Sequence, residues 1–313
     1  MTMRKKPVQF KPFKRTTFAF QKLTYCRRCG TFSILKEQVC SVCHKKTPIP
    51  VERQAELVAA KSLRIDALIA VFLFLAGVLL ARTSVESIAM ILCGLILLTL
   101  LFLFQRKWRK SFFLFHLDNM FHKQLPQIKA GLLRNSQSIV RDRDAGQERI
   151  AYEKLREIGT LLRSDPIRKL KLIFLNQFYL RKDMDLEMDS LIMREFDPDL
   201  VDYIGTIARI RKDLIKKRTL RYVTRYQIEI AKLPGGENIL IDVAGCALRT
   251  KPYIDQFRSL IIGQMRKLPK ERFLRLCKML HQREGYDWDD LYARAQAVCE
   301  EQYHWDPDFS KFF

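Results

Sequence analysis

The chain has 313 residues, enough for one to three domains, and a formal net charge of +22. The basic excess lies at the two ends: residues 1–64 contain 15 Lys and Arg against 3 Asp and Glu, and residues 105–313 contain 40 against 29. A surplus of this size predicts an acidic partner, which is anionic lipid, nucleic acid or an acidic protein surface. Eight cysteines without a regular pairing pattern exclude a secreted disulfide framework.

A basic arm, residues 1–23, precedes two CxxC motifs separated by ten residues, Cys26-Arg-Arg-Cys29 and Cys40-Ser-Val-Cys43. A CxxC turn brings two thiolates to one metal, and tetrahedral zinc takes four such soft donors. Gly30 suits the tight turn after the first motif. The spacing therefore predicts one structural Zn²⁺ per chain, bound by all four cysteines in residues 24–46.

With these motifs, residues 24–46 resemble the short zinc-ribbon modules at the N-termini of many bacterial membrane proteins. The resemblance implies a small β ribbon, and the metal-ligand role carries over to Cys26, Cys29, Cys40 and Cys43 alone. Two departures are Arg27-Arg28, where such modules often have proline, and His44, where a second glycine is usual. Two alternatives stay open: Cys40-Ser-Val-Cys43-His44 fits c-type haem attachment, and a CxxC pair also serves dithiol redox chemistry.

After a linker, residues 47–64, two apolar runs of 17 residues follow, 65–81 and 88–104. A helix needs roughly 17–25 residues to cross the hydrocarbon of a bilayer. Both runs are apolar on all sides, which is typical of membrane spans and not of one-faced core helices. About 64 mostly polar residues precede the first run, so we expect an uncleaved anchor. The pattern predicts a transmembrane helical hairpin over 65–104.

The orientation of this hairpin follows from the basic residues at its ends. The connecting loop carries only Arg82. The opposite flanks carry seven basic residues: Arg53, Lys61, Arg64, Arg106, Lys107, Arg109 and Lys110. We therefore expect a two-span, multi-pass protein of the cell membrane with both termini in the cytosol, against the anionic inner leaflet.

A juxtamembrane helical segment, residues 105–145, leads to a cytosolic helical domain, residues 146–313. Apolar residues recur there at helical spacing in stretches that begin at Ala151, Ile167, Leu200, Ile254, Phe273 and Trp288. Asp-Pro pairs at 165–166 and 197–198 predict helix starts, with Asp at the N-cap and Pro at the first helical position. Pro234-Gly235-Gly236 predicts a sharp break, and 240–243 reads as a strand. The fold class is therefore all-α, with a solenoid as an alternative arrangement of this domain.

The densest basic stretch, residues 211–225, is a candidate for binding an acidic partner or phosphate. Arg211, Arg218, Arg221 and Arg225 are spaced to share one helical face. The candidate residues are Arg211, Lys217, Arg218, Arg221 and Arg225. A solvated surface is the simpler interpretation of such a charge run. The aromatic C-terminus, 303–313, either packs on the domain or serves as a docking peptide.

No phosphate-binding glycine loop, nucleophile elbow or HExxH motif occurs in the sequence. We therefore predict a protein that is not an enzyme, with no catalytic residues and no small-molecule substrate. The first hypothesis is a membrane-anchored adaptor or scaffold that binds cytosolic protein partners. The alternative is a membrane-tethered nucleic-acid-binding protein that uses the basic arm and the 211–225 stretch, and the third is an enzyme whose site the sequence does not reveal.

Overall fold

The computed structural model describes residues 5–14, 16–18, 20–35, 37–81, 83–282 and 287–312. Within them the chain forms two compact units. The hairpin unit lies within 14–146, and the helical unit combines 5–13 with the described part of 147–312. In the sequence, the hairpin unit is therefore an insertion in the helical unit. The predictions that involve residues 1–4 and 15 of the arm, Arg82 and Phe313 fall outside the described residues.

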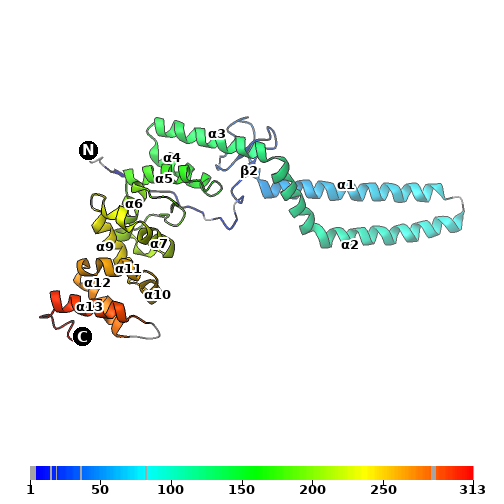
Figure 1. The fold of residues 1–313 in the computed structure, drawn as a ribbon. Helices are drawn as coiled ribbons and strands as arrows, with labels where there is room; N and C mark the ends of the chain where they lie inside the picture. The colour runs from blue at the N-terminus through cyan, green and yellow to red at the C-terminus, as the bar shows by residue number, and fades with distance from the viewer. Residues whose placement is uncertain are drawn as a thin grey trace. The chain divides into compact units, whose positions relative to one another are not determined.

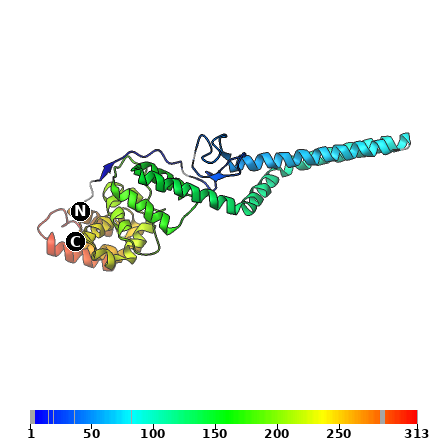
Figure 2. The same ribbon diagram turned by 90° about the horizontal axis from the view of Figure 1, so that it is seen from above.

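Two long helices dominate the hairpin unit. α1 (Val51–Leu80) and α2 (Ser84–Lys123) pack against each other as an antiparallel pair (Figure 1, Figure 2). Thr83 caps α2, since Glu86 N donates to Thr83 Oγ1 (3.3 Å) and Thr83 N donates to Glu86 Oε2 (3.3 Å). Each helix contains an apolar window of 18 residues, and the share of residues that are buried is 0% in the window of α1 and 6% in that of α2. The predicted pair of long apolar helices is confirmed, and both are long enough to cross a bilayer.

Two glycines let the apolar helices approach each other. A Cβ at Gly94 of α2 would overlap the ring of Phe74 on α1. A Cβ at Gly77 of α1 would lie 2.7 Å from Met90 Cε on α2. Each glycine thus leaves the space that a large side chain of the other helix fills, as is common where apolar helices pack in membranes.

The predicted small N-terminal sheet is also confirmed. It has three antiparallel strands, β2 (Thr24–Tyr25), β3 (Phe32–Ser33) and β4 (Ile49–Pro50), in the order β3-β2-β4. We call the described residues of 23–50 the cysteine ribbon. β4 runs directly into α1, so the first helix begins at Val51, inside the segment predicted as a linker.

The helix that follows α2 packs on the other edge of this sheet. α3 (Leu125–Asp144) contacts β3 through one face, which buries Ile128, Gly131, Leu132, Asn135 and Ile139. A Cβ at Gly131 would overlap the backbone carbonyl of Phe32, so the helix lies directly on the strand. Asn135 completes the strand edge: Ile34 N donates to Asn135 Oδ1 (3.0 Å), and Asn135 Nδ2 donates to Ser33 Oγ (3.1 Å). The ribbon thus binds both chain segments that lead into and out of the apolar hairpin.

The helical unit is a succession of short helices, most of which pack on a neighbour in the order α4, α5, α6, α9, α11 and α13 (Figure 1). Their bounds are α4 (Glu148–Ile158), α5 (Asp165–Gln177), α6 (Pro198–Ile210), η1 (Lys212–Leu214), α7 (Lys217–Arg225), α8 (Gln227–Ala231), α9 (Gly236–Ala247), α10 (Lys251–Gln256), α11 (Arg258–Gln264), η2 (Met265–Lys267), α12 (Lys270–His281) and α13 (Asp289–Gln302). The predicted, mostly helical composition of this region is confirmed.

Two local predictions for the helical unit need correction. Residues 240–243 lie in α9 and not in a strand, because Ile239, Leu240, Val243 and Ala244 are buried at helical spacing. The predicted break at 234–236 is present, since Gly235 has φ +75° before α9. However, α9 packs on both α6 and α8, so the two sides of the break share one core. The second correction concerns Asp165, which was predicted to be an N-cap: it is already the first residue of α5, and Ser164 occupies the N-cap position. The same prediction for Asp197, at the start of α6, is confirmed.

The first part of the basic arm, residues 5–13, packs on the helical unit. β1 (Lys6–Pro7) pairs in parallel with β5 (Phe178–Tyr179), and the ring of Phe10 lies 4.9 Å from that of Tyr152. Lys6 Nζ pairs with Glu148 at 2.6 Å. Backbone groups of the arm are also satisfied, since Arg156 Nη2 donates to Lys11 O (2.7 Å) and Phe13 N donates to Asp185 Oδ2 (3.1 Å).

The described part of the aromatic C-terminus packs back on the helical unit, which answers a question that the sequence left open. Phe309 is fully buried, and its ring lies 4.6 Å from Tyr303 and 5.5 Å from Phe273. Lys270 Nζ pairs with Asp306 (2.5 Å) and Asp308 (3.0 Å). This segment therefore belongs to the core of the helical unit.

Gly131→Ala tests the packing of α3 on the ribbon. Alanine normally stabilises a helix by about 1 kcal/mol relative to glycine, but at this position its Cβ would overlap the Phe32 carbonyl. We expect G131A to loosen the contact and to speed amide hydrogen exchange at Ile34, whose N–H donates to Asn135. Leu133→Ala, on the exposed side of α3, should leave that exchange unchanged. Equal Ile34 protection in G131A and wild type would contradict the close approach.

Candidate metal centre

The sulfur atoms of Cys26, Cys29, Cys40 and Cys43 meet at one point. All four Sγ atoms lie within 4.8 Å of one another, and the distances Cys26–Cys43 and Cys29–Cys40 are 3.6 Å. Sulfurs bound to one tetrahedral metal at about 2.3 Å would lie about 3.8 Å apart, whereas a disulfide requires about 2.0 Å. The four thiols are free, and their geometry fits a single shared metal ion. The cluster is compatible with a zinc ribbon.

The two CxxC motifs fold as matching turns. Gly30 N donates to Cys26 O (2.9 Å), and His44 N donates to Cys40 O (2.9 Å). The residue after each motif has a left-handed backbone, with φ +70° at Gly30 and φ +50° at His44. Among the described residues, His44 is the one non-glycine residue with positive φ. The sequence thus places a residue with a strained backbone where the resemblance implied glycine, and the turn still forms.

Hydrogen bonds to two of the sulfurs favour the thiolate form, which is the form that binds a cation. Burial acts to raise the pKa of Cys29, but hydrogen bonds from the Thr31 side chain and backbone, together with those from Cys26 and Cys40, lower that pKa to about 6. The backbone N–H of Lys45 lowers the pKa of Cys43. Burial raises the pKa of Cys40 to about 11. A bound cation would therefore be needed to deprotonate the Cys40 thiol at neutral pH.

The same geometry bears on the two alternatives for these motifs. The short sulfur–sulfur distances join Cys26 to Cys43 and Cys29 to Cys40, so each connects the two motifs. A dithiol redox pair would form its bond within one CxxC motif. Haem attachment would use only the second motif and leave Cys26 and Cys29 unexplained. One metal shared by both motifs accounts for all four residues.

The remaining cysteines lie away from this cluster. Cys246 and Cys277 are buried in the helical unit, and burial raises their pKa values to about 11 and about 12. Cys299 is also buried, and burial raises its pKa. Cys93 lies in the apolar part of α2. The three buried thiols behave as small core residues, as predicted for Cys277 from its place on an apolar stripe.

The five candidate residues of the basic stretch do not share one helical face. Arg211 lies between α6 and η1, outside α7, because the chain turns there. Its guanidinium forms a two-point ion pair with Asp213, at 2.9 and 2.8 Å, and donates to Lys182 O and Met184 O. The prediction of a common face is therefore wrong for Arg211, which holds a loop in place.

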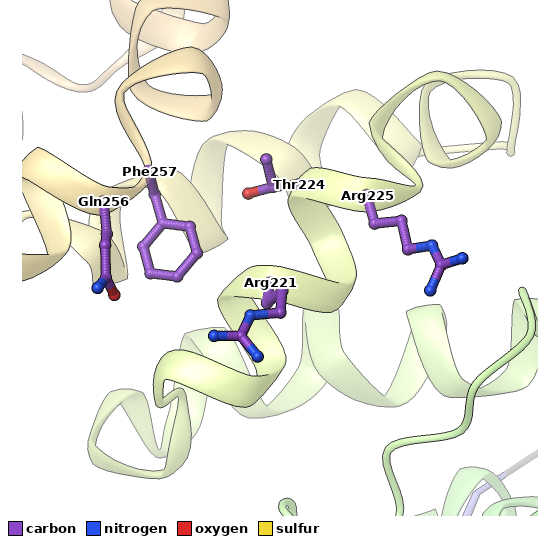
Figure 3. A pocket seen from close by; sticks show the side chains of 5 residues that line it. All are labelled: Arg221, Thr224, Arg225, Gln256 and Phe257. Atoms are coloured by element: carbon purple, nitrogen blue, oxygen red, sulfur yellow. The ribbon is translucent and has the colours of Figure 1, made fainter.

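The other four candidates, Lys217, Arg218, Arg221 and Arg225, are exposed on α7. Arg218 Nη2 contacts Ile192 O at 3.5 Å. Arg221 and Arg225 line a cavity that also involves three residues missed in the sequence analysis: Thr224, Gln256 and Phe257 (Figure 3). Thr224 lies on α7 itself and was missed because only the charged residues of that stretch were considered. Gln256 and Phe257, at the end of α10, were missed because they approach α7 only through tertiary packing.

Four thiolates limit what the metal centre can do chemically. A metal with four protein ligands keeps no open position for a substrate, so such a site supports the fold. No protein-family model, curated protein or solved structure matches this chain. The function is therefore inferred from the residues and contacts described above.

His44→Gly tests the left-handed turn after the second motif. A left-handed backbone costs an L-residue about 1–2 kcal/mol, and glycine removes that cost. We expect H44G to slow the removal of bound metal by a chromogenic chelator several-fold. His44→Ala is the matched control, because it removes the imidazole but keeps the Cβ and the strain. If H44A slows metal loss as much as H44G, the side chain and not the backbone limits the turn.

Proposed function

We propose that this chain is a membrane-anchored scaffold. α1 and α2 cross the bilayer as a hairpin, the cysteine ribbon holds one structural Zn²⁺, and the helical unit binds a cytosolic protein partner. The observation that carries the proposal is that almost none of the residues in the two apolar windows is buried. Exposure of apolar area to water costs roughly 25 cal/mol per Å², whereas the hydrocarbon of a bilayer accepts helices of this length and composition.

The charges at the ends of the hairpin support a cytosolic position for both units. Arg64 precedes the first predicted span, and Arg106 and Lys107 directly follow the second. Basic flanks are retained on the cytosolic side of a membrane. The chain is then a two-span protein of the cell membrane, and its basic surfaces face the anionic inner leaflet.

Zinc is the metal that best matches the cluster. Four thiolates in a tetrahedral arrangement select zinc or iron, and zinc is the usual choice for a closed structural site. The strands of the ribbon are only two residues long, too short to be stable alone. Metal binding would supply that missing free energy of folding.

The chain connections between the two units support the proposal that the helical unit binds its partner close to the membrane. The chain passes between the two units twice, near residues 13 and 147. Insertion of the hairpin would therefore tether the helical unit to the membrane at two points. Its exposed aromatic side chains include Tyr179 and Trp305, residue types in which the binding energy of protein interfaces is concentrated.

The nucleic-acid alternative receives less support from the contacts. The basic arm was one of its two surfaces, and residues 5–13 of that arm pack on the helical unit. Lys6 is paired with Glu148, and Arg211 of the second surface is paired with Asp213. Binding of mixed DNA or RNA at low salt, with a steep loss of affinity as salt rises, would favour this alternative.

Elemental analysis tests the zinc assignment. We expect about one zinc per chain in protein purified under reducing, chelator-free conditions, and progressive loss of zinc on acidification, because protons compete for the thiolates. Cys40→Ser should lose the zinc. Cys93→Ser is the matched control, since Cys93 lies outside the cluster, and it should keep the zinc. A ratio near zero, or iron in place of zinc, would show the assignment to be wrong.

Paired arginine substitutions test the scaffold at the membrane. Leu73 and Leu97 are 63% and 61% exposed, and Leu133 on α3 is 62% exposed. Each arginine at the centre of a membrane helix costs about 2.5–3.5 kcal/mol on insertion scales. We expect Leu73→Arg with Leu97→Arg to release the chain from alkaline-washed membranes. Leu133→Arg with Leu125→Arg should leave it bound.

Cross-linking of the same membranes then tests the partner. We expect wild type and the α3 control to cross-link reproducibly to one protein through the helical unit. The released variant should lose that cross-link, because it is no longer at the membrane. Retention of both paired variants in washed membranes would contradict the spanning hairpin. Absence of any cross-linked protein from wild type would contradict the scaffold.

A further inference from the structure

The cavity between α7 and the α10–α11 junction is distinct from the metal centre and plays no part in the proposed scaffold. Its volume is about 380 Å³, and it is lined by Arg221, Thr224, Arg225, Gln256 and Phe257 (Figure 3). Small-molecule sites usually measure about 300–1,000 Å³. The cavity is therefore larger than a bare anion needs and has room for a compact organic molecule.

Thr224 gives the first indication that this cavity has a ligand. Its hydroxyl oxygen is buried and has no hydrogen-bond partner among the described residues. A hydroxyl left in this state costs free energy, and buried polar groups without partners are uncommon in native proteins. Figure 3 shows the oxygen on the side of the helix that faces Phe257. A rotation about χ1 would turn this hydroxyl into the cavity, where a ligand would supply the missing partner.

Arg221 gives the second indication. It forms no ion pair with any described residue, in contrast to Arg211, which the chain neutralises with Asp213. In Figure 3 its guanidinium extends towards Phe257 and Gln256, beneath the Thr224 hydroxyl. A guanidinium and a hydroxyl that converge on one space favour a multivalent oxyanion.

Arg225 adds a second positive charge one helical turn further on. Its guanidinium extends away from Phe257 in Figure 3 and lies 5.5 Å from the centre of the Tyr226 ring. Exposed side chains change rotamer within nanoseconds, so Arg225 is able to swing towards a bound anion. A phosphate monoester carries a charge of about −1.5 to −2 at neutral pH, which balances two arginines, whereas a carboxylate balances one.

We propose that this cavity binds a small phosphate ester. Arg221 and Arg225 bind the phosphate, the Thr224 hydroxyl donates to one of its oxygens, and Gln256 and Phe257 contact the organic part. We assign the ester as a ligand and not as a substrate, since none of the five lining residues is a general base that could activate the Thr224 hydroxyl. The phosphate is carried either by a soluble metabolite or by a lipid headgroup, and the chemistry of recognition is the same.

Calorimetry on the full chain in detergent tests the proposal with ribose 5-phosphate, and with ribose as its uncharged counterpart. A second arm uses short-chain phosphatidylinositol 4-phosphate against short-chain phosphatidylcholine. We expect saturable binding of one phosphate probe per chain and none of either counterpart. Binding of the sugar phosphate assigns a soluble ligand, and binding of the phosphoinositide alone assigns a headgroup. Binding of neither phosphate probe overturns the proposal.

Three single substitutions localise the site. Arg221→Gln should weaken binding at least about tenfold, since hydrogen bonds to charged groups are the strong ones. Thr224→Val should weaken binding about fivefold, yet leave the melting temperature of the unliganded protein unchanged or higher, because it removes an unpaired hydroxyl. Lys217→Gln is the matched control: it removes the same charge from the same helix outside the cavity, and should change affinity less than twofold. Equal weakening by K217Q and R221Q would show general attraction to a basic helix and overturn the proposal.

Discussion

The hydrogen bond from Ile34 N to Asn135 joins the cysteine ribbon to the helix that follows the apolar hairpin. On the other edge of the same sheet, β4 continues without interruption into α1. The two ends of the hairpin are therefore held together by one small sheet. That sheet has strands of two residues, too short to be stable alone, and a metal bound by the four-cysteine cluster would stabilise it. A metal ion bound there would fix the geometry of both helices at this end of the hairpin.

The second constraint is the division of the chain. The helical unit takes its first residues from the basic arm and the rest from beyond the hairpin unit, so folding of the helical unit closes a loop that contains the entire hairpin unit. Phe10 and Phe309 anchor the two ends of the chain in the core of the helical unit. Among the described residues, the surface of the helical unit is therefore formed mainly by the faces of its helices. Such an arrangement suits a scaffold that presents a fixed surface near the bilayer.

The sequence predicted those features that depend on local spacing. Two CxxC motifs predicted the sulfur cluster, and two uninterrupted apolar runs predicted the long helices. Features that depend on tertiary packing were missed. Nothing near Gly131 indicates a strand carbonyl against it, and a short apolar run such as 240–243 fits a strand or a buried helix equally well. The spacing of Arg211 and Arg225 suggested one face, but spacing does not reveal the turn that separates them or the pairing of Arg211 with Asp213.

The central claim is that the metal stabilises the ribbon and, through it, the ends of the hairpin that the ribbon contacts. Hydrogen exchange of wild-type protein before and after chelation tests this claim most directly. The account predicts faster exchange in residues 31–35 and along α3 after chelation, with α6 in the helical unit unchanged. Faster exchange confined to residues 24–46, with α3 fully protected, would contradict it, because the ribbon would then be an independent appendage.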